Sequence, residues 1–97
     1  MFLTRRRRRQ FEDAQSAGPT PVIMSVTRFT CTISGTGFGQ KTGPAKLEVY
    51  EGGSWSERGT TYWNDTSIQH TGQVLDPGSK VRVTNSWGNV SNEFIVT

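Results

Sequence analysis

The chain has 97 residues, which is enough for one small domain and too few for several. It is 32% hydrophobic, its single cysteine excludes an internal disulfide, and no apolar run is long enough to span a membrane. The net charge of +3 is unevenly distributed, because residues 1–9 contain five arginines and no acid, whereas residues 10–97 contain six basic and eight acidic residues. The basic character therefore belongs to an N-terminal segment and not to the body of the protein.

Residues 1–20 are predicted to form an extended basic N-terminal arm that ends in a linker. The arm has a short apolar tip and a run of arginines that repel one another, and the small-residue linker from Ala14 to Thr20 buries too little apolar area to fold alone. A secretory signal would have an apolar run of about 7–15 residues after its positive charges, but Gln10-Phe11-Glu12-Asp13 stands there instead. We expect no signal peptide, and a protein made in the cytoplasm that leaves it only within a larger particle or by an unusual route.

Residues 21–97 are predicted to form one body of short strands separated by turns. Alternation of apolar and polar side chains, the period of a half-buried strand, indicates strands over 22–26 at a sheet edge, 28–34, 46–50, 55–63 as a hairpin pair, a segment that contains Ile68 and ends near Val74, 80–83, and 94–96. Turns are indicated at residues 35–39, 52–53, 76–78 and 88–89, where Gly and Pro gather. About seven short strands at this spacing predict an all-β fold closed as a sandwich.

Three blocks of the body stand out by their residues and spacing. They are Ser34-Gly35-Thr36-Gly37-Phe38-Gly39, Trp63-Asn64-Asp65-Thr66-Ser67-Ile68, and Val81-Arg82-Val83-Thr84-Asn85-Ser86-Trp87-Gly88-Asn89-Val90-Ser91-Asn92. Together these blocks resemble those of an IPT/TIG domain, an immunoglobulin-like β-sandwich. The likeness covers residues 21–97, and it implies a domain that binds, displays or spaces other molecules and rarely catalyses. Members of this family occur in cell-surface receptors, in DNA-binding transcription factors, beside carbohydrate-active domains and on phage head and tail proteins.

The chain departs from the family pattern in two places. Val26-Thr27-Arg28-Phe29 lacks the Pro and Gly of the turn that usually follows the first strand, and residues 51–62 form a longer and more aromatic segment than usual. The resemblance therefore predicts the sandwich but not the conformations of these two segments.

The sequence offers little for catalysis or metal binding. Residues 35–39 lack the Lys-Ser/Thr of a phosphate loop, so they are interpreted as a turn. His70 is the only histidine and Cys31 the only cysteine, and a structural zinc site needs four such ligands. A nucleophilic pair of Cys31 and His70 is an alternative, but Cys31 is predicted to face the core as an inert thiol. We expect no enzyme activity, no metal and no cofactor.

The large aromatic side chains are candidates for contact with a partner. Trp63 is expected in the core, at the position of a family tryptophan, whereas Trp55, between Ser54 and Ser56, is expected to be exposed at a loop tip. If exposed, Trp55, Tyr62 and Trp87 could stack on sugars or on bases. The alternative is that Trp87, like Trp63, fills the core or one end of the sandwich.

The arginine run Arg5 to Arg9 is the sharpest functional signal. It could bind nucleic-acid backbone by counterion release, or it could dock into an acidic groove of a protein through bidentate pairs with carboxylates. Simple solvated charge and nuclear import are the alternatives. The apolar residues Phe2, Leu3 and Phe11 lie on either side of the run and not within it. This arrangement favours a segment that fastens the protein to a partner, with apolar contacts at both ends, over a surface that stacks on bases.

These observations favour a non-enzymatic structural and binding protein. The leading hypothesis is a bacteriophage virion component, a capsid decoration or head/tail accessory protein. Its arm residues would fasten it to a capsid or tail subunit; they are Phe2, Leu3, Arg5, Arg6, Arg7, Arg8, Arg9 and Phe11. The alternatives are a carbohydrate-binding module that contacts host-surface glycans, and a nucleic-acid-binding protein that uses the arm. No association with a membrane is expected.

Overall fold

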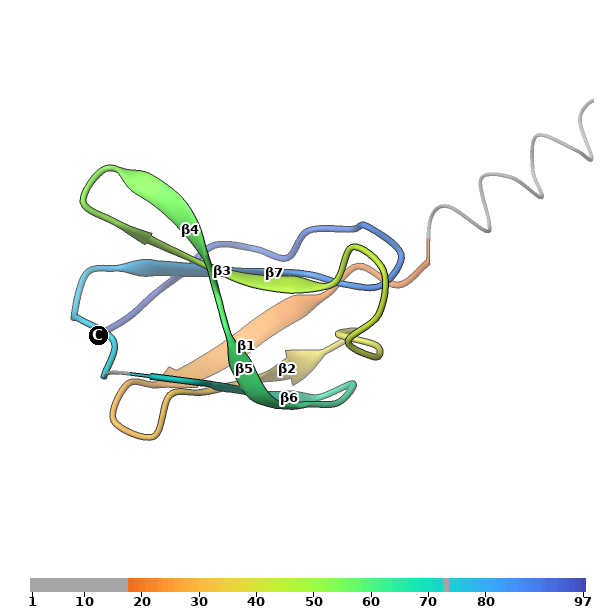
Figure 1. The fold of residues 1–97 in the computed structure, drawn as a ribbon, viewed down its shortest axis with the longest axis horizontal. Coiled ribbons are helices and arrows are strands. Elements are labelled where there is room, and N and C mark those ends of the chain that lie inside the picture. The colour runs from red at the N-terminus through yellow and green to blue at the C-terminus, as the bar shows by residue number, and fades with distance from the viewer. Residues whose placement is uncertain (1–17, 73) are drawn as a thin grey trace, which may run out of the picture.

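The computed structural model describes residues 18–72 and 74–97, and this part of the chain forms two antiparallel β-sheets that face each other (Figure 1). One sheet has the order β1-β2-β6-β5 and the other the order β4-β3-β7-β8. The strands are β1 (Val22–Thr27), β2 (Thr32–Thr36), β3 (Lys46–Glu51), β4 (Ser54–Arg58), β5 (Thr60–Trp63), β6 (Ser67–His70), β7 (Lys80–Thr84) and β8 (Phe94–Ile95). The predicted all-β sandwich is thus confirmed at the level of two packed antiparallel sheets.

The core lies between the two sheets and is built from the alternating side of each strand. The central strands β3 and β7 bury every second side chain and pair directly, so that Leu47 lies opposite Val83 and Val49 opposite Val81. Ile33 and Ile68 are paired in the other sheet and complete the centre, and all six of these side chains are fully buried. Burial of such side chains contributes about 1.5–3 kcal/mol each, which makes this contact between sheets the main stabilising feature.

The two ends of the sandwich are closed by side chains from loops. Phe38, after β2, is fully buried at one end, and Leu75, before β7, is 2% exposed at the other. We call the first end, with residues 18–20 and the turn 85–89, the linker pole. The opposite end, with the segments 28–31, 51–53 and 74–79, is the distal pole, and Figure 1 shows the C-terminus there.

Gly35 shows why the glycine-rich block follows this strand. It pairs with Ile23 of β1, and a Cβ on it would lie 1.9 Å from the carbonyl oxygen of Val22 and 2.8 Å from the Phe38 ring. No side chain fits in that space, so glycine allows β1 and Phe38 to approach β2 closely.

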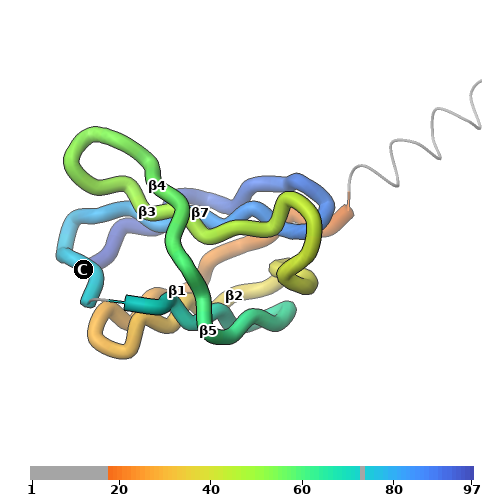
Figure 2. Tube along the Cα trace, in the orientation of Figure 1, coloured from red at the N-terminus to blue at the C-terminus, as the bar shows by residue number. Residues whose placement is uncertain are grey.

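The predicted hairpin over residues 55–63 is wrong. β4 pairs with β3 and β5 pairs with β6, so these consecutive strands belong to different sheets. The chain crosses from one sheet to the other at Gly59, as the green segment in Figures 1 and 2 shows. Alternation predicts that both segments are extended, but it does not say which neighbours they pair with.

The predicted strand over residues 28–34 begins too early. β2 starts at Thr32, and Phe29, expected to face the core, is 73% exposed in the turn that joins β1 to β2. Cys31 is buried as expected, but from the turn and with a positive φ of 55°. The strand expected to end near Val74 also ends earlier, at His70.

Other predictions of local structure are confirmed. β1 is an edge strand, β3 ends at the Gly52-Gly53 turn, and β7 buries Val81 and Val83 while Lys80 and Arg82 lie on its other side.

Candidate functional site

The linker enters the sandwich through a network of hydrogen bonds around Asn85. This side chain is fully buried at the end of β7, and its amide donates to the carbonyl oxygens of Pro19 at 2.6 Å and Gly37 at 3.0 Å. Its oxygen accepts from the backbone N–H groups of Trp87 at 3.1 Å and Asn89 at 3.0 Å. One side chain therefore ties together the linker, the glycine-rich turn after β2 and the turn after β7.

Trp87 covers the same junction. Its indole lies so close to the linker that a Cβ on Gly18 would be 2.4 Å from the Trp87 Cγ atom, and the far edge of the ring lies beside Gly39. The side chain is nevertheless 44% exposed. Trp87 is therefore partly packed on the linker and partly open, and its role as a contact residue stays a prediction.

Trp55 does not lie at a loop tip, so that part of the prediction is wrong. It belongs to β4, opposite Tyr50 of β3, and the two ring centroids are 5.2 Å apart. The Arg82 guanidinium lies 4.0 Å from the centroid of the Trp55 ring, a cation–π contact across the outer face of the sheet. The indole is half-buried by these neighbours, which leaves less of it for stacking on a ligand.

The other two aromatics of the same segment differ in exposure. Tyr62 is 52% exposed, and its hydroxyl accepts a hydrogen bond from the Asn64 side chain at 2.7 Å. Trp63 packs against the core, as expected, and its ring N–H donates to the Gly39 carbonyl at 3.1 Å.

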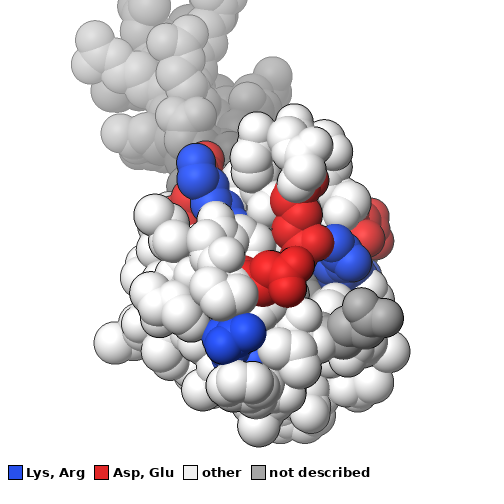
Figure 3. Space-filling model, turned by 90° about the vertical axis from the view of Figure 1, so that its left-hand side faces the viewer, with Lys and Arg blue, Asp and Glu red and all other residues white. Residues whose placement is uncertain are grey.

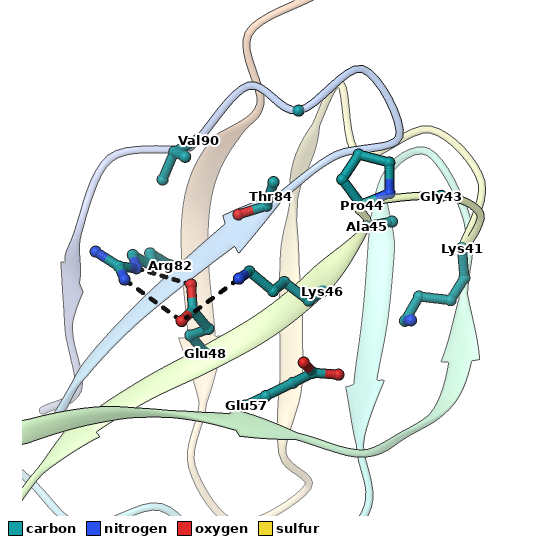
Figure 4. Close-up of a pocket in the computed structure, with 11 residues that line it drawn as sticks. Lys41, Gly43, Pro44, Ala45, Lys46, Glu48, Glu57, Arg82, Thr84 and Val90 are labelled. Atoms are coloured by element: carbon teal, nitrogen blue, oxygen red, sulfur yellow. Dashed lines mark hydrogen bonds and ion pairs between the residues drawn. The ribbon is translucent and has the colours of Figure 1, made fainter.

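The outer face of the sheet β4-β3-β7-β8 carries a shallow cavity of about 540 Å³ (Figure 4). Arg82 donates to both carboxylate oxygens of Glu48, at 3.0 and 3.4 Å, and Lys46 approaches the same carboxylate at 4.0 Å. The paired side chains lie along the floor, with Lys41 and Glu57 at the sides. The lining has three basic and two acidic residues, and two of the basic side chains already pair with Glu48, so we assign no ligand to this cavity.

A second cavity, of about 390 Å³, lies at the distal pole, and we call it the distal cavity. Its charged residues and its histidine come from the end of β3, from β4, from the end of β6 and from the loop before β7; they are Glu51, Glu57, Arg58, His70 and Asp76. Figure 3 looks onto this pole and shows acidic side chains near its centre with basic side chains around them.

His70 is the least exposed of the polar groups around the distal cavity. The residue is 7% exposed, and its Nδ1 atom has no hydrogen-bond partner among the described residues. Burial lowers the pKa of His70 below its ordinary value of 6.5, the nearby Arg58 lowers it further, and Glu51 opposes the shift. The imidazole is therefore neutral at pH 7 and presents one acceptor and one donor nitrogen.

Cys31 and His70 lie side by side, but their connection is through the backbone. The His70 N–H donates to the Cys31 carbonyl at 2.8 Å, and the Cys31 thiol donates to the Arg28 carbonyl at 3.5 Å. Cys31 and His70, considered above as a nucleophilic pair, are therefore neighbours because β2 and β6 pair in the same sheet. Within residues 18–72 and 74–97, no three His, Cys, Asp or Glu side chains are arranged to hold a metal ion.

The arm residues lie outside the part of the chain that the structure describes. They are Phe2, Leu3, Arg5, Arg6, Arg7, Arg8, Arg9 and Phe11. The structure therefore shows where the linker joins the sandwich but not the arm. Sequence reasoning missed the Asn85 network and the distal cavity, because both depend on residues that only the fold brings together.

Comparison with known proteins gives no match. No family model fits the chain, and no curated protein or solved structure is detectably similar to it. Among the described residues there is no helix with the length and apolarity needed to cross a membrane.

Proposed function

We propose that this protein is a non-catalytic structural and binding protein, an immunoglobulin-like sandwich of the IPT/TIG type that attaches to a partner subunit through its basic arm. The strand orders β1-β2-β6-β5 and β4-β3-β7-β8 support the immunoglobulin-like type. They correspond to the ABED sheet of such sandwiches and to a CFG sheet extended by one strand.

The observation that carries this proposal is the attachment of the linker at Asn85. Its two hydrogen bonds to Pro19 and Gly37 set residues 18–20 against the linker pole. A basic arm that starts from a defined point on a rigid sandwich can hold the domain in one orientation on a surface. The distal pole then faces away from that point of attachment (Figure 1).

We propose a bacteriophage particle as the assembly, with the protein as a capsid decoration or head/tail accessory protein made in the host cytoplasm. The likeness of residues 21–97 to a family found on phage heads and tails motivates this assignment. Many weak copies on a symmetric particle would gain attachment strength from avidity.

The alternatives have less support from the described residues. A carbohydrate platform at Trp55 is disfavoured because Arg82 covers its ring. A nucleic-acid-binding face normally has a stripe of Lys and Arg, whereas residues 18–97 contain six basic and six acidic side chains.

The test uses full-length protein in which Arg5 to Arg9 are all replaced by Gln, followed by co-sedimentation with particles from the source lysate. The variant is expected to stay in the supernatant, because the guanidinium groups that pair with partner carboxylates are gone. Replacement of the same residues by Lys is the matched control, since it keeps the charge and removes the bidentate fork.

Two results would contradict the proposal. Full sedimentation of the Gln variant would show that the arm does not attach the protein. Release of the wild-type protein by nuclease would show that the arm is bound to nucleic acid and not to a protein subunit.

A further inference from the structure

In the described part of the chain the two sheets have four edge strands, and three of these edges are blocked. β1 contains a bulge, and the Asn92 side chain accepts from the Ile23 N–H at 2.8 Å and donates to the Ile23 carbonyl at 3.2 Å. β5 is irregular between Thr60 and Tyr62, and β8 has only two residues. Bulges, short strands and covering side chains are devices that keep an edge strand from pairing with another chain.

β4 is the exception, because it is regular and its outer edge is open. Its five residues pair with β3 without a register shift, and it contains no proline. The turn that joins the two strands, Gly52-Gly53, has positive φ at both residues, which is the two-residue turn that matches the twist of a hairpin. The hairpin of β3 and β4 stands out from the rest of the body, and no described strand lies beyond β4 (Figure 1).

The hydrogen bonds of the sheet show which backbone groups of β4 point to this open edge. The Val83 N–H donates to the Ser91 hydroxyl and the Val83 carbonyl accepts from the Ser91 N–H, each at 2.8 Å, so both groups of Val83 point away from β3. Backbone groups alternate in direction along antiparallel strands. The register from β7 through β3 to β4 therefore directs the groups of Leu47 toward β4, and those of Trp55 and Glu57 toward the open edge. The latter groups form no hydrogen bond with the described turns and loops.

Two such edges match each other in one antiparallel register. With a two-fold axis at Ser56, Trp55 of each copy lies opposite Glu57 of the other, and each of these pairs exchanges two backbone hydrogen bonds. An axis at Trp55 or at Glu57 pairs only one of these residues, and an axis at Glu57 also sets two carboxylates directly against each other. With the axis at Ser56, Arg58 lies opposite Ser54, so no like charges are opposed.

We propose that β4 pairs with β4 of a second copy of this chain, so that two four-stranded sheets join into one continuous eight-stranded sheet. A second copy fits this edge because it offers the same two free residues at the same spacing, in a register without opposed like charges. The interface is isologous and closes as a dimer. The inference goes beyond the proposed function, because the arm takes no part in it.

The experiment is sedimentation velocity of nuclease-treated full-length protein at concentrations up to about 1 mM. The wild-type protein is expected to show a reversible monomer–dimer equilibrium with a dissociation constant between about 1 μM and about 1 mM, since contact along one short strand is smaller than a stable interface. A wild-type protein that stays monomeric at about 1 mM would overturn the proposal.

Opposite charges at Ser56 test both the partner and the register. Ser56 is exposed, and it would lie directly opposite Ser56 of the other copy. Ser56→Lys alone and Ser56→Asp alone are each expected to dimerise about tenfold more weakly or less, because like charges are opposed, whereas an equimolar mixture of the two should dimerise at least as tightly as wild type. Gln69→Lys is the matched control, since it adds the same charge at an exposed position of the other sheet and should leave dimerisation unchanged.

A proline at Glu57 tests the backbone pairing itself. Glu57→Pro removes an N–H that points to the open edge, so it costs the monomer no hydrogen bond within the sheet but is expected to abolish the dimer. Glu57→Gln keeps the N–H and should still dimerise. The dispersion of amide signals in the NMR spectrum of each variant shows that the sandwich is folded.

The possible results separate this proposal from the proposed function. Dimerisation of Ser56→Lys at the wild-type level, or a mixture of the two Ser56 variants that stays monomeric, would overturn the pairing of β4 with β4. So would loss of the dimer when Arg5 to Arg9 are replaced by Gln, because association would then depend on the arm. The β4 variants keep their arm, so their co-sedimentation with particles tests the proposed function independently of the dimer.

Discussion

Replacement of Asn85 by Ala should strongly destabilise the sandwich. The fully buried amide makes four hydrogen bonds, to the carbonyls of Pro19 and Gly37 and from the N–H groups of Trp87 and Asn89. Each such bond contributes about 0.5–1.5 kcal/mol net, so four give about 2–6 kcal/mol. Since water can replace part of the contacts beside the exposed Trp87, we expect a loss of about 3 kcal/mol in the free energy of unfolding.

Urea unfolding followed by tryptophan fluorescence measures this loss. For a domain of this size, about 3 kcal/mol corresponds to a decrease of roughly 15 °C in the thermal midpoint. Asn89→Ala is the control, because the half-buried Asn89 side chain donates a longer hydrogen bond, of 3.2 Å, to the same Pro19 carbonyl. We expect at most about 1 kcal/mol for it. If Asn85→Ala costs no more than this control, the argument that Asn85 organises the linker pole is refuted.

Two further predictions follow from close packing and from burial. Gly35→Ala should lower the free energy of unfolding by about 3 kcal/mol or more, because its Cβ would overlap the Val22 carbonyl oxygen. Gly59→Ala is the control, and it should change this free energy by less than about 0.5 kcal/mol, because the nearest atom to its Cβ would be 3.8 Å away. Equal urea midpoints for the two variants would contradict the prediction. Because burial lowers the folded-state pKa of His70 below 6.5, the unfolded chain binds the proton first, so stability should fall as the pH drops below about 6.5. His70→Gln should show a smaller difference between urea midpoints at about pH 8 and pH 5.5, and an unchanged difference would contradict the reasoning.

The strands that could be predicted are those whose two faces differ. In β3 and β7, buried Leu47 and Val83 alternate with charged residues such as Glu48 and Arg82, so the period of two identifies both the strand and its inward face. The same pattern failed at Phe29, which alternates with polar neighbours but lies exposed in a turn. Alternation describes local preference, and it does not reveal where the chain must reverse to bring β1 and β2 into register.

The candidate surfaces could be predicted less well than the strands. Glycine and serine neighbours suggested an exposed loop at Trp55, but pairing of β4 with β3 places it under Arg82 and beside Tyr50. The distal cavity had no local signal at all, because Glu57, His70 and Asp76 come from three segments. The arginine run needed no structure to be recognised, since its chemistry is contained in consecutive residues.

The sequence by itself determined the local features of this protein: the concentration of arginine in residues 5–9, extended segments, turns at glycine and proline, and the inward faces of the central strands. Each of these depends on neighbouring residues along the chain. Only the tertiary structure decided that β4 and β5 lie in different sheets, that Asn85 holds the linker, and that the buried His70 lies beside the ion pair of Arg58 and Glu51. These features depend on contacts between residues far apart in sequence, which form because the two sheets must bury their apolar faces against each other.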